Sequence, residues 1–279
     1  MKKLLTFILF ICFIINKNAI IYSASEALNI WSKSLFPVLY PTLILSDVLL
    51  ASGIINKIPK IFYNIYSHIF KTSPYGLFVF LVSVFAATPT NAKILKDLYD
   101  NKLIDKNSLS KILSQTIFFN PILILTFSNL KVLIIMWVSN ILTSFILRNK
   151  LVSNDTNLKD INFKFNLNES IEKNMKTILN ILGTLTLFLS LSSIIPIKNQ
   201  ILKTLISGIL EITSGFSRIK LYLTSPLNDI MMLIFVTLAS FSIIMQIKSI
   251  LKEIKFDSKY FYASRFITLI LSLFIYFIA

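Results

Sequence analysis

Long apolar segments, separated by shorter polar ones, dominate the hydropathy pattern of this 279-residue chain. Several of them approach the roughly 20 residues that an α-helix needs to cross a bilayer. The alternation over about ten residues that is typical of an outer-membrane barrel does not occur in the sequence. The pattern therefore predicts an all-α, polytopic helical membrane protein with about six to eight membrane segments. The apolar segments that we assign as spans or parts of spans are residues 1–22, 35–55, 75–87, 117–128, 130–147, 178–195, 201–216, 227–247 and 263–279.

The first apolar segment, residues 1–22, begins with Lys2 and Lys3 and continues with an apolar run over residues 4–15. A secretory signal peptide has the same layout. Apolar residues return at 19–22, however, and the chain is strongly apolar downstream. We therefore expect this segment to be retained as a first span.

The longest polar segment, residues 148–176, is rich in Asn, Asp and Lys and divides the apolar segments into two groups. We predict an N-terminal span and connector (1–34), a first membrane half (35–147), this segment as a cytosolic linker, and a second membrane half (177–279). Within the first half, residues 56–73 are basic and aromatic, which favours an interfacial connector over a span.

Basic residues outnumber acidic ones, with 28 Lys and Arg against 13 Asp and Glu and a net charge of +15. In a soluble protein this balance would indicate nucleic-acid binding. Here the basic residues lie in short segments between apolar ones, where the positive-inside rule places them. We therefore expect the lipid bilayer to be the partner of most of this charge, with a smaller share attracting an anionic solute, and we expect no nucleic acid.

The positive-inside rule also suggests how two short apolar segments are used. If residues 75–91 crossed the membrane completely, the five lysines of residues 93–111 would lie outside. A re-entrant segment that turns back keeps those lysines inside. Residues 201–216, which form only half a span, then dip into the membrane from the opposite face. One broken segment in each half predicts an inverted-repeat secondary transporter with its site near the membrane midplane.

Composition excludes several kinds of site. The single cysteine, Cys12, and the single histidine, His68, cannot form an internal disulfide or a Cys/His zinc site. His68 has no acidic sequence neighbour with which to form a catalytic triad, and the sequence contains no GxxxxGK[ST] phosphate-binding loop. We therefore predict a protein that is not an enzyme and that uses no cofactor and no metal.

Polar residues cluster where the apolar segments break. A charged residue at mid-span costs roughly 2.5–3.5 kcal/mol on insertion scales, and non-helical backbone at membrane depth is tolerated only where it is buried or lines a cavity. We therefore predict that the breaks form a substrate-binding site. Its residues are Thr88, Pro89, Asn91, Asn120, Glu211, Thr213 and Gln246.

Each break also has a structural interpretation. The first break would be a helix that ends at the membrane surface and is capped by Asn91, and Asn120 would precede a proline-initiated helix. Gly215 would mark a helix C-terminus, and Glu211 would be an interfacial residue or the partner of a buried lysine. Gln246 would be an interfacial residue at the end of a span. These alternatives remain open at the level of sequence.

The segment 35–55 contains three further polar or helix-breaking residues. Pro37 and Pro41 are expected to interrupt its helical hydrogen bonding. Asp47, like Asp229 in the second half, is either a carboxylate of the solute pathway or a residue near the membrane surface.

Five stretches together give the chain a resemblance to a known family. They are WSKSLFPVLYPTLILSDVLLASG (31–53), ATPTNAKILKDLY (87–99), FNP (119–121), GILEITSG (208–215) and MQIKSIL (245–251). In these stretches, and in their order, the chain resembles the YlbJ-type sporulation integral membrane proteins, which belong with the nucleoside-recognition (Gate) domain proteins.

This chain departs from the family at glycines. The family pattern carries glycines around the proline of the second stretch, approximately G-[YF]-P-x-G-A-K, where this chain has Ala87 and Asn91. A glycine-rich approach to the glutamine is replaced by residues 238–242. The chain is also shorter than typical members.

The resemblance implies a role in endospore formation, with transport of dipicolinic acid, a small aromatic dicarboxylate, across the outer forespore membrane. We accordingly expect a multi-pass protein of the cell membrane, or of the outer forespore membrane, that acts as a permease for a small anionic solute. The alternative is a non-transporting membrane scaffold or assembly factor for the spore envelope. Assembly into a homo-oligomer is left open.

Overall fold

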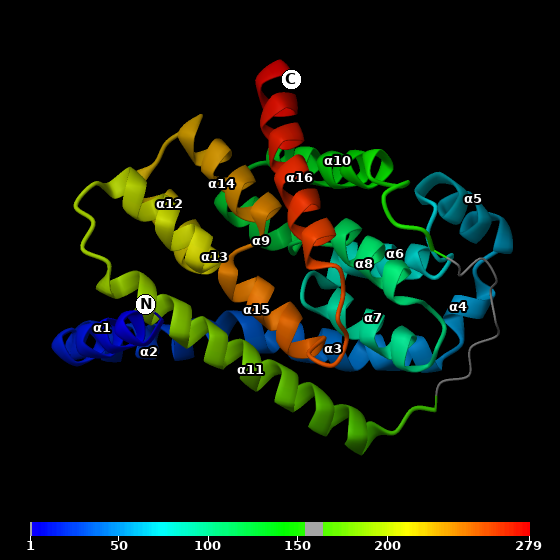
Figure 1. The fold of residues 1–279 in the computed structure, drawn as a ribbon, viewed down its shortest axis with the longest axis horizontal. Coiled ribbons are helices and arrows are strands. Elements are labelled where there is room, and N and C mark those ends of the chain that lie inside the picture. The colour runs from blue at the N-terminus through cyan, green and yellow to red at the C-terminus, as the bar shows by residue number, and fades with distance from the viewer. Residues whose placement is uncertain (1, 154–163) are drawn as a thin grey trace.

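The computed structural model describes residues 2–153 and 164–279, and every regular element within these ranges is a helix (Figure 1). The all-α prediction is therefore confirmed. The elements are α1 (Lys2–Ile15), α2 (Lys17–Ile30), the π-helical turn η1 (Trp31–Leu35), α3 (Phe36–Ala51), α4 (Ile54–Lys57), α5 (Lys60–Phe70), α6 (Gly76–Ala86), α7 (Thr90–Asp100), α8 (Lys106–Gln115), α9 (Pro121–Phe127), α10 (Leu130–Ile146), α11 (Leu167–Ile194), α12 (Gln200–Leu210), α13 (Ile212–Tyr222), α14 (Leu227–Leu238), α15 (Phe241–Ile250) and α16 (Ser258–Ile278).

Four helices in the described ranges are long and apolar enough to cross a membrane. They are Lys17–Ala51, which joins α2, η1 and α3, Leu167–Ile194, Leu227–Ile250, which joins α14 and α15, and Ser258–Ile278. The helices α6, α10 and α12 are apolar but shorter. Helices of this length and composition indicate an integral membrane protein.

The predicted interruption of ordinary helical hydrogen bonding occurs at the π-helical turn η1, directly before Pro37, although α2, η1 and α3 still run as one 35-residue helix. Pro37 lies in the first turn of α3, where η1 shifts the hydrogen bonds to i→i+5, so that the Phe36 N–H bonds the Trp31 carbonyl. A π-helical turn of this kind absorbs the change in hydrogen bonding that the missing proline N–H requires. Pro41 is accommodated on an exposed face inside α3.

Two pairs of short helices reverse the direction of the chain. The helices α12 and α13 pack closely against each other and are joined by the single residue Glu211. Their approach depends on glycine, since a Cβ atom at Gly215 would lie 2.5 Å from the Gly208 Cα atom. Gly215 therefore lies inside α13 and does not mark the helix C-terminus that the sequence suggested. The helices α6 and α7 also pack together and are joined by residues 87–89.

In two further places, a short non-helical segment separates two consecutive helices. Residues 116–120 separate α8 from α9, and residues 239–240 separate α14 from α15. The sequence of a paired hairpin, a broken helix and a straight helix therefore occurs twice: α6 to α10 and α12 to α16. The two sets contact each other, with α7 against α15, α9 against α13 and α10 against α16.

Residues 93–111, whose five lysines indicated a polar segment, are mostly helical and packed inside the protein. They belong to α7 and α8, whose side chains Leu95 and Ile112 are fully buried. Lys93 and Lys111 are only 1% and 5% exposed. Hydropathy averages miss such helices because each buried lysine offsets several buried aliphatic residues.

Two boundaries differ from those that the sequence predicted. Part of the proposed linker, residues 154–163, lies outside the described residues, and its last ten residues belong to α11, which begins at Leu167. Asn166 starts that helix by accepting hydrogen bonds from the backbone N–H groups of residues 168 and 169. The last helix, α16, begins at Ser258 and includes Arg265.

Candidate functional site

A cavity of about 300 Å³ lies where the helix breaks meet. Six of the seven predicted site residues line it, and they come from both halves of the chain. The residues that line it are Ser34, Leu35, Val38, Leu39, Ala87, Thr88, Pro89, Phe119, Asn120, Ile122, Leu123, Thr126, Ile181, Glu211, Ile212, Thr213, Ile243 and Gln246.

The junction between α6 and α7 forms one wall of the cavity. Ala87 has a φ of 60°, and the Thr88–Pro89 peptide bond is cis. The Thr88 backbone N–H donates to the Phe118 carbonyl at 2.9 Å, which fixes this junction to the break after α8. The Thr88 hydroxyl is buried and makes no hydrogen bond in the described residues, so it is free to contact a solute.

Asn91 is the one predicted site residue that does not line the cavity. It is fully buried in the first turn of α7, and its side-chain Nδ2 donates to the carbonyl and hydroxyl oxygens of Thr116 at 3.0 and 3.2 Å. It therefore ties the start of α7 to the end of α8. The suggested helix end capped by Asn91 is wrong, because α7 begins at Thr90.

Asn120 lines the cavity and also begins a helix. Its Oδ1 accepts from the backbone N–H groups of Ile122 and Leu123 at 2.8 and 3.4 Å, and Pro121 occupies the first position of α9. Both interpretations of this break are thus compatible with the structure, because the helix starts at the cavity wall.

Glu211 is the one ionisable residue among the residues that line the cavity. It is 3% exposed and caps α13, accepting from the Ser214 backbone N–H at 2.9 Å and from the Thr213 hydroxyl at 2.5 Å. It forms no ion pair within the described ranges. The suggested pairing with a buried lysine is therefore wrong.

Gln246 lies inside α15, four residues before this helix and the candidate span Leu227–Ile250 end. Its Nε2 donates to the Ser242 and Thr184 hydroxyls, both at 3.2 Å, so it connects α15 to α11. The break before α15 contains Ala239, which has a φ of 58°, and Ser240, which caps the helix.

The electrostatics of the cavity come mainly from the backbone. The N-terminal ends of α7, α9 and α13 border it, and each such end carries a partial positive charge of roughly half an elementary charge. The cavity has no basic side chain among its lining residues. The site thus combines three positive helix ends with one carboxylate, Glu211, which itself occupies the end of α13.

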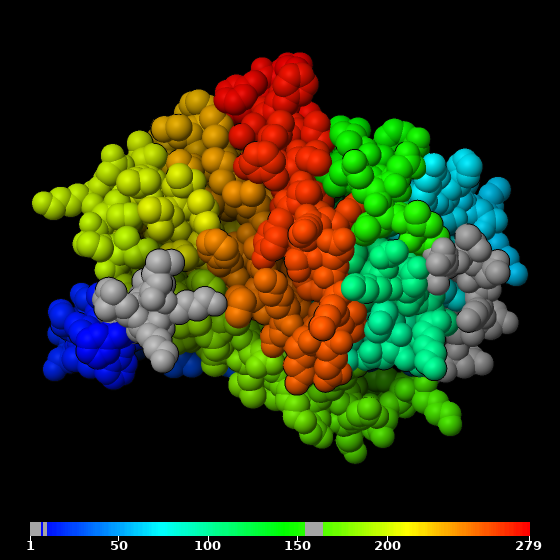
Figure 2. All heavy atoms as spheres, in the orientation of Figure 1, coloured from blue at the N-terminus to red at the C-terminus, as the bar shows by residue number. Residues whose placement is uncertain are grey.

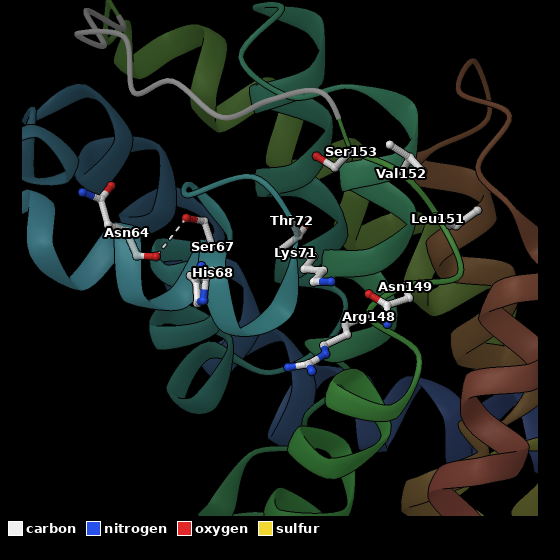
Figure 3. Close-up of a pocket in the computed structure, with 10 residues that line it drawn as sticks. All are labelled: Asn64, Ser67, His68, Lys71, Thr72, Arg148, Asn149, Leu151, Val152 and Ser153. Carbon is white, nitrogen blue, oxygen red and sulfur yellow. Dashed lines mark hydrogen bonds between the residues drawn. The ribbon is translucent and has the colours of Figure 1, made fainter.

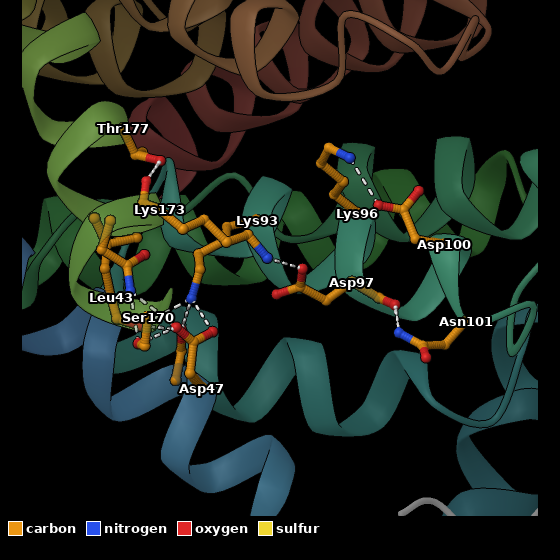
Figure 4. Close-up of polar contacts among 12 residues, drawn as sticks. Leu43, Asp47, Lys93, Lys96, Asp97, Asp100, Asn101, Ser170, Lys173 and Thr177 are labelled. Carbon is orange, nitrogen blue, oxygen red and sulfur yellow. Dashed lines mark hydrogen bonds and ion pairs between the residues drawn. The ribbon is translucent and has the colours of Figure 1, made fainter. Parts of the chain in front are cut away.

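A buried ion pair that the sequence did not reveal lies next to this site (Figure 4). Lys93, near the start of α7, pairs with Asp47 of α3, and its Nζ also donates to the Leu43 carbonyl at 2.9 Å and to the Ser46 hydroxyl at 3.1 Å. The partners are 46 residues apart in the sequence, and the one available signal was an acid and a lysine that each interrupt an apolar pattern.

The same polar cluster reaches α11. Asp47 accepts from Ser170 at 2.5 Å and from Asn174 at 2.8 Å, and Asp97 of α7 pairs with Lys173. Asp47 is therefore an internal ion-pair partner and does not line the cavity. Asp229 does not line it either; it accepts from Asn129 at 3.0 Å at the start of α14.

Comparison with known proteins gives no match to a protein-family model, to a curated protein or to a solved structure. The function must therefore be argued from the geometry of the site and from the resemblance described above.

Proposed function

We propose that the chain is an integral membrane permease that carries a small, anionic solute through the cavity between the helix breaks. The observation that carries this proposal is that residues of three helix breaks, from both halves of the chain, line one largely apolar cavity and place Thr88, Asn120 and Glu211 in its wall. Broken helices are tolerated at membrane depth where they line a cavity, and transporters place solute sites at such breaks.

The repeated order of elements supports an inverted-repeat permease. The hairpins lie at opposite sides of the molecule in Figure 1, with α6 and α7 toward the right and α12 and α13 toward the left. The junction of each hairpin contributes residues to the cavity lining. This arrangement is consistent with two re-entrant hairpins among about six to eight membrane segments.

The size and charge of the cavity favour a small carboxylate. A volume of about 300 Å³ is at the lower end for ligand sites, and the apolar residues Leu123, Ile212 and Phe119 provide contacts for a ring or short chain. Helix N-termini favour an anion without any basic side chain. Dipicolinate, and with it the role in endospore formation at the outer forespore membrane, is suggested by the family resemblance alone.

Glu211 gives the proposed permease a proton dependence. In its ionised form, its carboxylate occupies the N-terminus of α13, which is the position that an anionic solute would use. Two carboxylates in one cavity repel each other, so solute binding favours the protonated form of Glu211. The solute is therefore expected to move together with a proton.

Charged groups on the surrounding helices leave Glu211 without a nearby cation. Glu26 of α2 is the charged residue whose field reaches it most directly. The remaining charges on the packed helices are engaged elsewhere or lie toward helix ends. They are Lys17 of α2, Lys33 of η1, Asp47 of α3, Lys203 of α12, Arg218 and Lys220 of α13, Asp229 of α14, Lys248 of α15, and Glu169, Glu172, Lys173 and Lys176 of α11.

The test is uptake by the purified chain in proteoliposomes, using dipicolinate and other small carboxylates that stay fully ionised between pH 6 and pH 8. The apparent affinity of the natural protein should fall as the external pH rises. Glu211→Gln should bind the solute with an affinity that no longer depends on pH, whereas Glu172→Gln, an exposed carboxylate paired with Lys176, should behave like the natural protein.

Absence of uptake by folded protein would contradict the permease and favour the scaffold. Uptake with an unchanged pH dependence in Glu211→Gln would contradict only the role of Glu211.

A further inference from the structure

A second pocket, of about 590 Å³, lies away from the solute cavity and shares none of its lining residues (Figure 3). It lies between α5 and the segment that follows α10. Ser67, His68 and Lys71 border it on one side, and Arg148 and Asn149 border it on the other.

The pocket is rich in hydrogen-bond donors and lacks acidic residues among the residues that line it. Lys71, His68 and Arg148 form no ion pair within the described ranges. The Thr72 side chain is 5% exposed, and its hydroxyl has no hydrogen-bond partner there. The Arg148 guanidinium lies over the Phe145 ring and donates to the Ile69 carbonyl at 3.4 Å. A buried hydroxyl without a hydrogen-bond partner, beside cations that have no carboxylate partner, points to an anionic ligand.

Lys111 holds the two sides of the pocket in place. Its Nζ donates to the carbonyl of Lys71 on one side, and to the carbonyls of Arg148 and Leu151 on the other at 2.7 and 3.0 Å. Because Lys111 is 5% exposed, this connection lies beneath the pocket floor. The basic side chains above it therefore project from a fixed backbone.

The position of α5 places this pocket at the membrane surface. One face of α5 exposes Ile61, Phe62, Ile65 and Ile69, which are 38–63% exposed. The opposite face is anchored by Tyr63, which donates to the Ile55 carbonyl at 2.8 Å, and burial raises the pKa of this phenol and keeps it protonated. An 11-residue helix is too short to span a bilayer, so an amphipathic helix of this kind lies in the interface.

We propose that this pocket binds the phosphodiester headgroup of an anionic glycerophospholipid, whose acyl chains lie along the apolar face of α5. Lys71 and Arg148 contact the phosphate oxygens, and the Thr72 hydroxyl donates to the same group. Basic pockets at helix ends on the cytoplasmic side bind such headgroups. The site is independent of the solute cavity, and its binding is measured without transport.

The test uses the full chain in nanodiscs of phosphatidylcholine containing increasing fractions of fluorescent phosphatidylglycerol. Lys71→Gln combined with Arg148→Gln should weaken lipid binding by about thirtyfold, because each of the two cations near the surface contributes roughly 1 kcal/mol. The matched control is Lys60→Gln combined with Lys150→Gln, which removes the same charge from α5 and from the segment after α10 without altering the pocket lining. It should weaken binding clearly less.

Thr72→Val provides a second variant that leaves the charge unchanged. It should weaken lipid binding by about fivefold, because one hydrogen bond is lost. An equal loss in the matched control and the pocket variant, together with no effect of Thr72→Val, would indicate diffuse attraction and overturn the proposal. Displacement of the lipid by inorganic phosphate at comparable concentration would overturn it as well, since the acyl chains would then contribute nothing.

Discussion

Two alanines at the helix breaks have backbone conformations that favour glycine. Ala87 has φ and ψ of 60° and 173°, and Ala239 has 58° and 128°. Non-glycine residues in this region are strained by roughly 1–3 kcal/mol. The strained residues therefore lie in the two segments where the family that the chain resembles carries glycines.

Ala87→Gly and Ala239→Gly should each raise the free energy of unfolding by about 1 kcal/mol, because relief of strain exceeds the added freedom of the unfolded chain. The measurement is denaturant unfolding in detergent, followed by circular dichroism. Ala86→Gly, one residue earlier and inside α6, should instead lower stability by about 0.5–1 kcal/mol. A loss in all three variants would show that the breaks are not strained.

Single and combined substitutions of Lys93 and Asp47 should lower the free energy of unfolding by amounts that do not add. Lys93→Met leaves a buried carboxylate without its cation and should cost about 3 kcal/mol of unfolding free energy. Adding Asp47→Asn should recover part of that loss, since the uncompensated charge is gone while Ser170 and Asn174 still reach the side chain. Additive losses in the same unfolding assay would show that the two residues do not interact.

The sequence predicted most of the residues that line the cavity, but not the buried ion pair of Lys93 and Asp47. Thr88, Asn120 and Glu211 were identifiable because each is polar at a break in an apolar segment, and Gln246 because it is a polar residue that follows an apolar run. The pairing of Lys93 with Asp47 was not, because it depends on the packing of α7 against α3, for which the local sequence carries no signal.

At the scale of elements, the hairpin of α12 and α13 depends on close contact between two glycines. Gly215→Ala should destabilise the protein by about 2 kcal/mol, because its Cβ atom would meet the Gly208 backbone, which cannot move aside independently. The matched control is Gly183→Ala in α11, where the added Cβ atom has no neighbour within 4 Å. That change should stabilise the protein by about 0.5–1 kcal/mol.

The measurement is the thermal unfolding temperature of Gly215→Ala and Gly183→Ala in detergent, each compared with the natural protein. Equal stabilisation by the two substitutions would mean that α12 and α13 separate in solution.

Helix positions were largely predictable, whereas helix pairing was not. The apolar segments at 75–87 and 130–147 correspond to α6 and α10 within a few residues. Pro37 indicated a change in helical hydrogen bonding, but the form of that change, a π-helical turn within a continuous helix, was not predictable from the sequence pattern. The buried helices α7 and α8 were misplaced because their lysines are satisfied by carbonyls and a carboxylate inside the protein.

At the scale of the whole molecule, the inverted repeat makes a topological prediction. In a Cys12→Ser background, Lys102→Cys in the turn after α7 and Lys198→Cys before α12 should be labelled from opposite sides of the membrane by an impermeant maleimide. Lys150→Cys, after α10, should be labelled from the same side as Lys102→Cys. Labelling of all three positions from one side would contradict opposite insertion of the two hairpins.

The apolar contacts of the molecule divide at the cavity. The large core joins α6 to α10 with α13 to α16, whereas the contacts of α11 with α2, η1 and the first half of α3 form small separate clusters around Leu185 and Ile181. The polar contacts Asp47–Asn174, Asp97–Lys173 and Thr184–Gln246 connect these two bodies. In the proposed permease, sliding of one body along the other would expose the solute while both apolar cores stay intact. The strength of these polar contacts would then set the fraction of molecules in the open state.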